Sequence, residues 1–198
     1  MATVSSRRDP DRTEAVLRAT LELAQEVGYA KLSIEGIAAR AGVGKHTVYR
    51  RWPSKGAVVL DVLLASKQQL GYPDTGDIVA DLRAQMRAGM ELLARPGISA
   101  LYPALIGEIQ NDAALAAAFR ERWLKPVTDG TRARLLLARE RGQLSPDVDP
   151  DMVIALLYGP LYYRILVAPG PYDAAFVDSL LDAAFAGLKP PADSRHVS

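Results

Sequence analysis

Residues 32–55 read LSIEGIAARAGVGKHTVYRRWPSK, and this stretch predicts two short helices joined by a glycine turn. Ser33 is placed to cap the first helix, because its hydroxyl can accept a hydrogen bond from a free backbone amide. The small side chain of Ala38 lets the helices pack closely, Gly42 supplies the unusual turn backbone, and Val48 anchors the second helix on the core. This is the layout of a helix-turn-helix, whose second helix enters the major groove of DNA.

The second of these helices is expected to present one polar face. Val48 and Trp52, four residues apart, point to the core side of the helix. The exposed face carries Lys45, His46, Tyr49 and Arg50. We expect contacts to base edges or phosphates from Lys45, His46 and Arg50, and contacts to phosphates from Thr47, Tyr49, Arg51 and Lys55. A solvated charged face on a helical hairpin is the alternative, but spacing, turn and charge together favour DNA contact.

Charge is distributed unevenly along the 198 residues. Residues 1–56 carry ten basic and six acidic side chains, whereas the remaining residues carry fourteen basic and seventeen acidic ones. The overall charge of +1 therefore hides a basic N-terminal segment, for which a polyanion is the natural partner. Cysteine is absent and only two histidines occur, far apart at His46 and His196. We therefore expect no metal site and no cofactor, and no catalytic motif is evident.

The whole chain is predicted to be all-α, because strand signals are missing and strong helix formers dominate. About nine helices are expected, at 11–27, 33–41, 45–52, 54–70, 77–94, 98–110, 113–141, 149–167 and 173–187. Pro126 must kink or restart the long seventh helix, because proline cannot donate the helical hydrogen bond. Residues 1–56 form the expected DNA-binding domain, 57–198 a larger ligand-binding and dimerisation domain, 57–71 a connecting helix and 189–198 a flexible tail.

The block GIAARAGVGKHTVYRRWPSKGAVV at 36–59 resembles the DNA-binding signature of the tetracycline-repressor family of bacterial regulators. The resemblance implies a homodimeric repressor that binds a double-stranded DNA operator and is released by an unidentified small-molecule effector. It also implies that the DNA-contacting residues include Ser33, Lys45, His46, Thr47, Tyr49, Arg50 and Lys55. His46 departs from the small residue usual at its position, so the operator sequence cannot be transferred from other members.

The C-terminal half offers two further sets of candidate residues. A pocket for the effector is expected among Met86, Met90, Tyr102, Phe119, Trp123, Tyr158 and Tyr162, although ordinary core packing is an equal alternative. A dimer interface is expected on the last two helices, from Ile154, Leu157, Leu161, Ile165, Phe176, Leu180 and Ala184.

A helical enzyme or small-molecule carrier with an incidental basic hairpin is the competing function. The lack of a catalytic constellation argues against it. The first residues contain no apolar stretch, and the apolar segment 152–171 is interrupted by glycine and proline, so we expect a cytoplasmic protein without a membrane partner.

Overall fold

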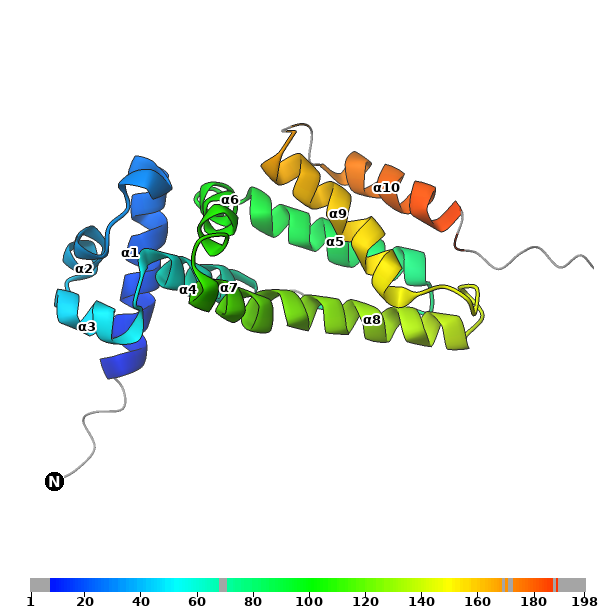
Figure 1. Ribbon diagram of the computed structural model, residues 1–198, viewed down its shortest axis with the longest axis horizontal. Helices are drawn as coiled ribbons and strands as arrows, with labels where there is room; N and C mark the ends of the chain where they lie inside the picture. The colour runs from blue at the N-terminus through cyan, green and yellow to red at the C-terminus, as the bar shows by residue number, and fades with distance from the viewer. Residues whose placement is uncertain (1–7, 68–70, 169, 171–172, 187, 189–198) are drawn as a thin grey trace, which may run out of the picture. The chain divides into compact units, whose positions relative to one another are not determined.

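The structure is a computed structural model that describes residues 8–67, 71–168, 170, 173–186 and 188. Over these residues the chain is helical and contains no strand, as the sequence predicts (Figure 1). The expected tail at 189–198 lies outside the described residues. The elements are α1 (Arg8–Lys31), α2 (Ile34–Ala41), α3 (Lys45–Arg51), α4 (Lys55–Lys67), α5 (Ile78–Ala94), α6 (Ile98–Ile109), α7 (Ala113–Phe119), the π-helical turn η1 (Arg120–Leu124), α8 (Lys125–Glu140), α9 (Pro150–Leu166) and α10 (Ala174–Ala186).

The chain packs as two compact units, which differ from the division expected at residue 56. Unit 1 consists of 1–69 and 92–123, and unit 2 of 70–91 and 124–198. The difference arises because α4 has apolar side chains on all its sides, so it packs against α1, α6 and α7 within unit 1. Its buried members are Val58, Val59, Leu60, Val62 and Leu63.

Helix α1 organises the N-terminal part of unit 1. Its helical run is interrupted at Gly28, where the sequence predicts an end, and one further turn reaches Lys31. Arg40 of α2 donates two hydrogen bonds to the Glu26 carboxylate of α1, at 2.8 and 2.6 Å. These hydrogen bonds lower the pKa of Glu26, so the pair stays charged and fixes α2 against α1.

The helix predicted over 113–141 is divided into α7, η1 and α8. The division lies just before Pro126, which sits in the first turn of α8, where a missing amide costs no helical hydrogen bond. Lys67 of α4 donates to the Trp123 carbonyl at 3.1 Å, and its ammonium lies 5.0 Å from the centre of the Trp123 ring. This contact occupies a carbonyl of the π-helical turn.

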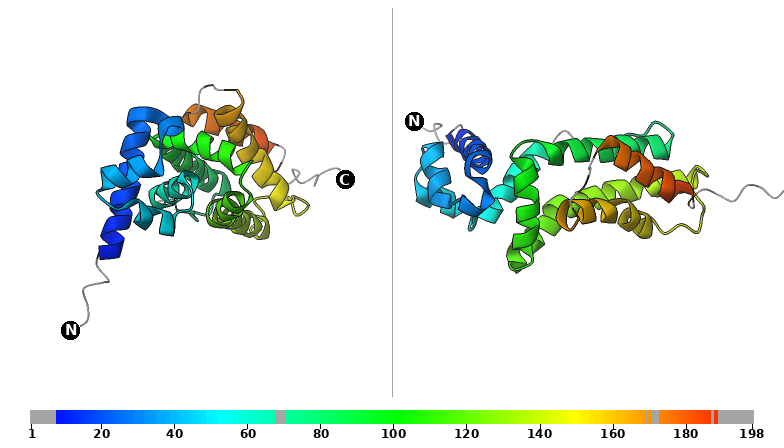
Figure 2. Two further views of the ribbon diagram at one scale, coloured as in Figure 1. Left: turned by 60° about the vertical axis from the view of Figure 1, so that its left-hand side comes forward. Right: turned by 90° about the horizontal axis from the view of Figure 1, so that it is seen from above.

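Unit 2 is built from most of α5 together with α8, α9 and α10, which run alongside one another (Figures 1 and 2). Its core holds, among others, Ile78, Leu82, Leu135, Leu157 and Leu181. Arg83 and Arg87 of α5 both pair with Asp178, which ties α5 to α10 along the edge of this core.

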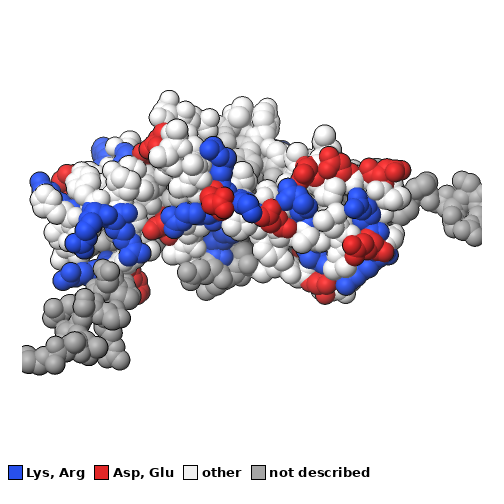
Figure 3. All heavy atoms as spheres, turned by 60° about the horizontal axis from the view of Figure 1, so that its bottom comes forward, with Lys and Arg blue, Asp and Glu red and all other residues white. Residues whose placement is uncertain are grey.

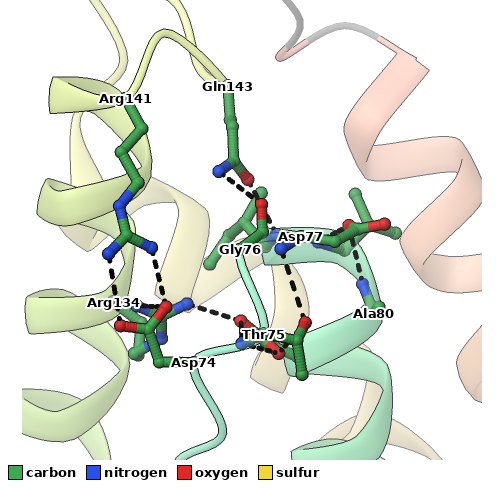
Figure 4. Close-up of polar contacts among 11 residues, drawn as sticks. Asp74, Thr75, Gly76, Asp77, Ala80, Arg134, Arg141 and Gln143 are labelled. Carbon is green, nitrogen blue, oxygen red and sulfur yellow. Dashed lines mark hydrogen bonds and ion pairs between the residues drawn. The ribbon is translucent and has the colours of Figure 1, made fainter.

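A polar network joins the loop before α5 to α8 (Figure 4). Arg134 and Arg141 both pair with Asp74, and Arg134 also reaches the buried Asp81. Burial would raise the pKa of Asp81, but hydrogen bonds from Thr75 and Arg134 outweigh burial and lower it. Gln143 accepts from the Ile78 amide and donates to the Gly76 carbonyl, both at 2.8 Å. The start of α5 is thereby held on α8.

Gly56, at the start of α4, allows a close approach between helices. A Cβ atom there would lie 2.6 Å from the Leu115 side chain and 3.0 Å from the Glu108 carboxyl group. We expect Gly56→Ala to lower the free energy of unfolding by about 1–3 kcal/mol, because Leu115 is buried and must move.

The matched control for this change is Gly107→Ala. Gly107 lies in α6, and a Cβ atom there would meet nothing within 4 Å. Alanine should stabilise the helix by up to about 1 kcal/mol. Urea unfolding of both variants checks the contrast, and a stabilising Gly56→Ala would show that the close approach is absent.

Candidate nucleic-acid interface

Helix α3 presents the polar face that the sequence predicts. Val48 is completely buried and Trp52 is 4% exposed, so the apolar side of α3 faces the core of unit 1. The side chains of Lys45, His46, Tyr49 and Arg50 are exposed on the other side. His46 and Arg50 project most directly away from Val48, because residues of an α-helix follow one another at about 100°.

The turn before α3 is fixed by backbone hydrogen bonds. Ser33 caps α2, and its hydroxyl oxygen accepts from the Gly36 amide at 3.1 Å. Gly42 adopts a left-handed conformation with φ 66°, which a residue with a side chain rarely takes. Its amide donates to the Ala39 carbonyl, and the Val43 amide donates to the Ala38 carbonyl at 3.0 Å. α2 therefore ends in a closed turn that sets the direction of α3.

Tyr49 links α3 to α2. Its hydroxyl donates to the Glu35 carboxylate at 3.1 Å. This hydrogen bond to an anion raises the pKa of Tyr49, so the phenol keeps its proton at neutral pH and remains a donor. Because Glu35 is exposed, a DNA phosphate could replace it and accept the hydrogen bond from the Tyr49 hydroxyl.

Trp52 holds the end of α3 in place. Its indole nitrogen donates to the Asp61 carboxylate of α4 at 2.8 Å, and Arg122 of η1 pairs with the other oxygen of Asp61 at 2.7 Å. The Arg51 guanidinium lies 5.1 Å from the centre of the Trp52 ring. Asp61 was not among the sequence candidates, and its one signal was a carboxylate within the apolar run of α4.

Lys55 has a different environment from the one expected. Its ammonium donates to the Tyr29 carbonyl at 3.3 Å and lies 4.3 Å from the centre of the Tyr29 ring. The structure therefore gives Lys55 a partner at the end of α1, and a phosphate contact would have to compete with that partner.

Charge gathers around this part of unit 1. Lys and Arg atoms cluster over the α1–α3 region in Figure 3. Between residues 33 and 56 the chain has five basic side chains, and its one acid is Glu35. A surface of this kind attracts the phosphate backbone of nucleic acids.

The residues expected to line one pocket fall into two groups. Tyr102, Phe119 and Trp123 form a buried aromatic cluster in unit 1, with ring centres 5.6 to 6.5 Å apart. Met86, Met90, Tyr158 and Tyr162 belong to unit 2. The seven residues are therefore divided between the two units and do not all lie within either one.

Three of the four expected dimer residues on α9 face the core of unit 2. Ile154, Leu157 and Leu161 are 8%, 0% and 6% exposed, because they pack in the core of unit 2. Ile165, Phe176, Leu180 and Ala184 are partly buried. Apolar residues occur at helical spacing on more than one side of α9. The periodicity of the sequence therefore could not tell which side packs in the core.

Two further expectations concern metals and membranes. Among the described residues, no group of three or more His, Asp or Glu side chains is placed to hold a metal ion. None of the helices that the structure describes is long and apolar enough to cross a bilayer.

Comparison with protein families gives two matches that together span most of the chain. Residues 16–62 match the model described as bacterial regulatory proteins of the tetR family, and residues 72–184 match the tetracyclin repressor-like C-terminal domain.

Individual relatives agree with these matches. The HTH-type transcriptional regulator YdeS of Bacillus subtilis is 32% identical over 184 residues, which is 92% of both chains. The DNA-binding transcriptional repressor TetR of Mycobacteroides abscessus is 31% identical over 177 residues, 88% of this chain and 92% of that protein.

Solved structures show the same similarity. The TetR family transcription regulator SCO0332 aligns with a TM-score of 0.73 and 40% identity, covering 91% of this chain and all of that one. FadR of Thermus thermophilus aligns with a TM-score of 0.69 over 94% of this chain and 100% of that one. Its identity of 23% supports a shared fold alone.

Arg50 is expected to read a base. Two parallel hydrogen bonds from its guanidinium to a guanine would discriminate against other bases by about 1–3 kcal/mol. Selection of duplexes from a random pool by the intact protein and by Arg50→Ala should therefore show that the variant has lost a base preference of the intact protein.

Arg120→Ala is the control for this prediction, because it removes the same charge from an exposed site on η1. It should select the same sequences as the intact protein. If Arg50→Ala also selected unchanged sequences, Arg50 would not be a base-reading residue.

Proposed function

Because the chain belongs to the tetracycline-repressor family of DNA-binding transcriptional regulators, we propose that it is a homodimeric repressor released from its operator by a small molecule. The relatives are transcriptional regulators, so the alternative of a helical enzyme or carrier is set aside. The observation that carries the proposal is an uncovered apolar stripe on α9, combined with a single short recognition helix in each chain.

The stripe on α9 consists of large apolar side chains that unit 2 leaves in solvent. Met152 is 58% exposed, Leu156 48%, Tyr163 57% and Val167 68%. Intervals of four, seven and four residues place these side chains, of which Val167 directly follows α9, on one side of the helix and opposite Leu161 in the core. Large exposed apolar stripes are uncommon on monomers and mark interaction surfaces.

The neighbouring helix α10 favours the same use. Its exposed residues include Ala175, Ser179, Ala183 and Ala186, whose small side chains let another helix approach closely. A two-fold axis would pair α9 and α10 of one protomer with those of its partner as four helices. We expect this interface to bury well over about 1,000 Å².

The dimer explains how a seven-residue helix can select an operator. One α3 reaches only a few base pairs, whereas two of them contact successive turns of the major groove when they are about 34–36 Å apart. The two-fold symmetry of such a dimer requires an inverted repeat in the DNA. Selection from a random duplex pool tests this, and a single unrepeated site or no enrichment would count against the proposal.

The effector is proposed to bind in unit 2, near a buried polar group. Gln85 of α5 donates to the Thr131 and Tyr158 hydroxyls at 2.8 and 2.7 Å, beside the apolar core of unit 2. Burial raises the pKa of Tyr158 to about 12, so its hydroxyl stays neutral and can exchange partners with a polar ligand. The Thermus thermophilus FadR structure holds lauroyl-CoA, which supports a small-molecule site in this fold.

Release from DNA follows from a difference in affinity. A ligand weakens operator binding only if it binds the DNA-free conformation more tightly than the DNA-bound one. By the same linkage, the operator lowers the affinity of the protein for the ligand by an equal factor. Titration calorimetry of the ligand with and without operator, and of the operator with and without ligand, measures the two factors.

Leu156→Glu tests the α9 stripe. A carboxylate at the centre of an apolar interface is buried without a partner, so the dimer should dissociate at micromolar concentration and affinity for the inverted repeat should fall about 100-fold or more. Sedimentation and gel retardation measure the two effects.

The control for Leu156→Glu is Ala133→Glu. Ala133 is an exposed residue of α8 that lies outside the stripe. This variant should stay dimeric and bind normally. If the Leu156→Glu protein sediments as a dimer, as the intact protein is expected to do, the dimer interface lies elsewhere.

A further inference from the structure

A hollow beside the recognition helix is lined in part by α1 residues to which no DNA contact has been assigned so far. It has a volume of about 200 Å³ and lies in unit 1, where the first turns of α1 meet α3. Its polar lining comes from Arg12 and Thr13 of α1 and from Thr47, Arg50 and Arg51 of α3. Among the described residues no acidic side chain lines it, and the polar lining consists of three cationic side chains and two hydroxyl groups.

The apolar part of the lining is buried in unit 1. Val16, Val48 and Trp52 line the hollow and are at most 4% exposed. The stacking of Arg51 on the Trp52 ring orders one guanidinium above this part of the lining. Less side-chain entropy is therefore lost when Arg51 binds an anion. The volume admits a tetrahedral anion together with several waters.

The position of the hollow relative to the base-reading face points to its ligand. Tyr49 lies on the flank of α3 that faces α2, where its hydroxyl meets Glu35. Thr47 and Arg51 lie on the opposite flank, which faces α1. His46 and Arg50 lie between the two flanks, because consecutive residues differ by about 100° around the helix.

A helix in the major groove has one DNA strand on each side. The groove is about 12 Å wide, close to the diameter of an α-helix with its side chains, so both sugar-phosphate backbones pass next to its flanks. Tyr49 is placed for one strand. The hollow is placed for the other strand, and its guanidinium groups match a phosphate in charge and geometry.

We propose that the hollow binds a backbone phosphodiester of the operator strand opposite the one at Tyr49, with Arg12 as a positioning residue outside the helix-turn-helix. This inference rests on the proposed function. It extends the DNA contacts to α1, and it groups Arg12 around one phosphate with Thr47 and Arg51, for which the sequence already predicts phosphate contacts. Phosphate contacts fix the register of the protein on DNA without reading its sequence.

The test compares Arg12→Ala with Arg18→Ala, a matched loss of charge at an exposed α1 residue that does not line the hollow. Affinity is measured between about 0.05 and 0.2 M salt for the selected duplex and for a scrambled duplex of equal length. Arg12→Ala should weaken binding to both duplexes by a similar factor of about ten, and the slope of log affinity against log salt should fall by about 0.9 per subunit. Arg18→Ala should keep the slope of the intact protein, and Arg12→Lys should keep most of it.

A scan with single neutral methylphosphonates then locates the contact. One position in each half-site should weaken the intact protein and leave Arg12→Ala unaffected, and that position should lie on the strand opposite the one sensed by Tyr49→Phe. Equal salt slopes for Arg12→Ala and the intact protein, or a changed base preference in Arg12→Ala, would overturn the proposal. Thermal unfolding of each variant separates lost contact from lost fold.

The two duplexes separate failure of this inference from failure of the proposed function. Equal binding of the intact protein to both duplexes would contradict sequence-specific repression, yet the salt slopes on either duplex would still decide the role of Arg12. If the intact protein bound neither duplex, both proposals would be wrong.

Discussion

Burial of one side of α3 is the constraint on which the rest of the interface depends. Val48 and Trp52 lie in the core of unit 1, and the Trp52 indole is held by Asp61 of α4. A seven-residue helix is too short to be stable alone, so its shape comes from this packing rather than from its own hydrogen bonds. Because the buried side is fixed, the outward direction of His46 and Arg50 is fixed as well.

The same constraint gives α3 two distinct flanks. On one flank Tyr49 meets Glu35 of α2, and on the other Arg51 stacks on Trp52 beside the hollow that Arg12 also lines. A duplex offers base edges in front of such a helix and phosphates on both sides. We therefore propose that α3 contacts phosphates with its flanks and base edges with its centre.

The sequence was most informative where local rules decide the structure. The cap at Ser33, the left-handed Gly42 and the opposed faces of α3 could all be predicted, because each depends on neighbours within a few residues. Pro126 marked the start of α8 in the same way. Such features follow from backbone sterics and helical periodicity.

Features set by tertiary contacts were missed. The apolar side of α9 that faces the core could not be chosen from spacing, so Leu157 was assigned to a dimer surface although it is fully buried. Lys55 finds its partner 26 residues earlier, at the Tyr29 carbonyl, and Asp61 joins Trp52 to Arg122 across three elements. No local pattern encodes such pairings.

The structure of the protein bound to a selected inverted-repeat duplex would test this account most directly. The account predicts α3 in the major groove, with Arg50 and His46 at base edges and with Tyr49 and Arg12 at phosphates of opposite strands. An α3 that lies outside the groove, or a groove occupied by the Val48 side of the helix, would contradict it.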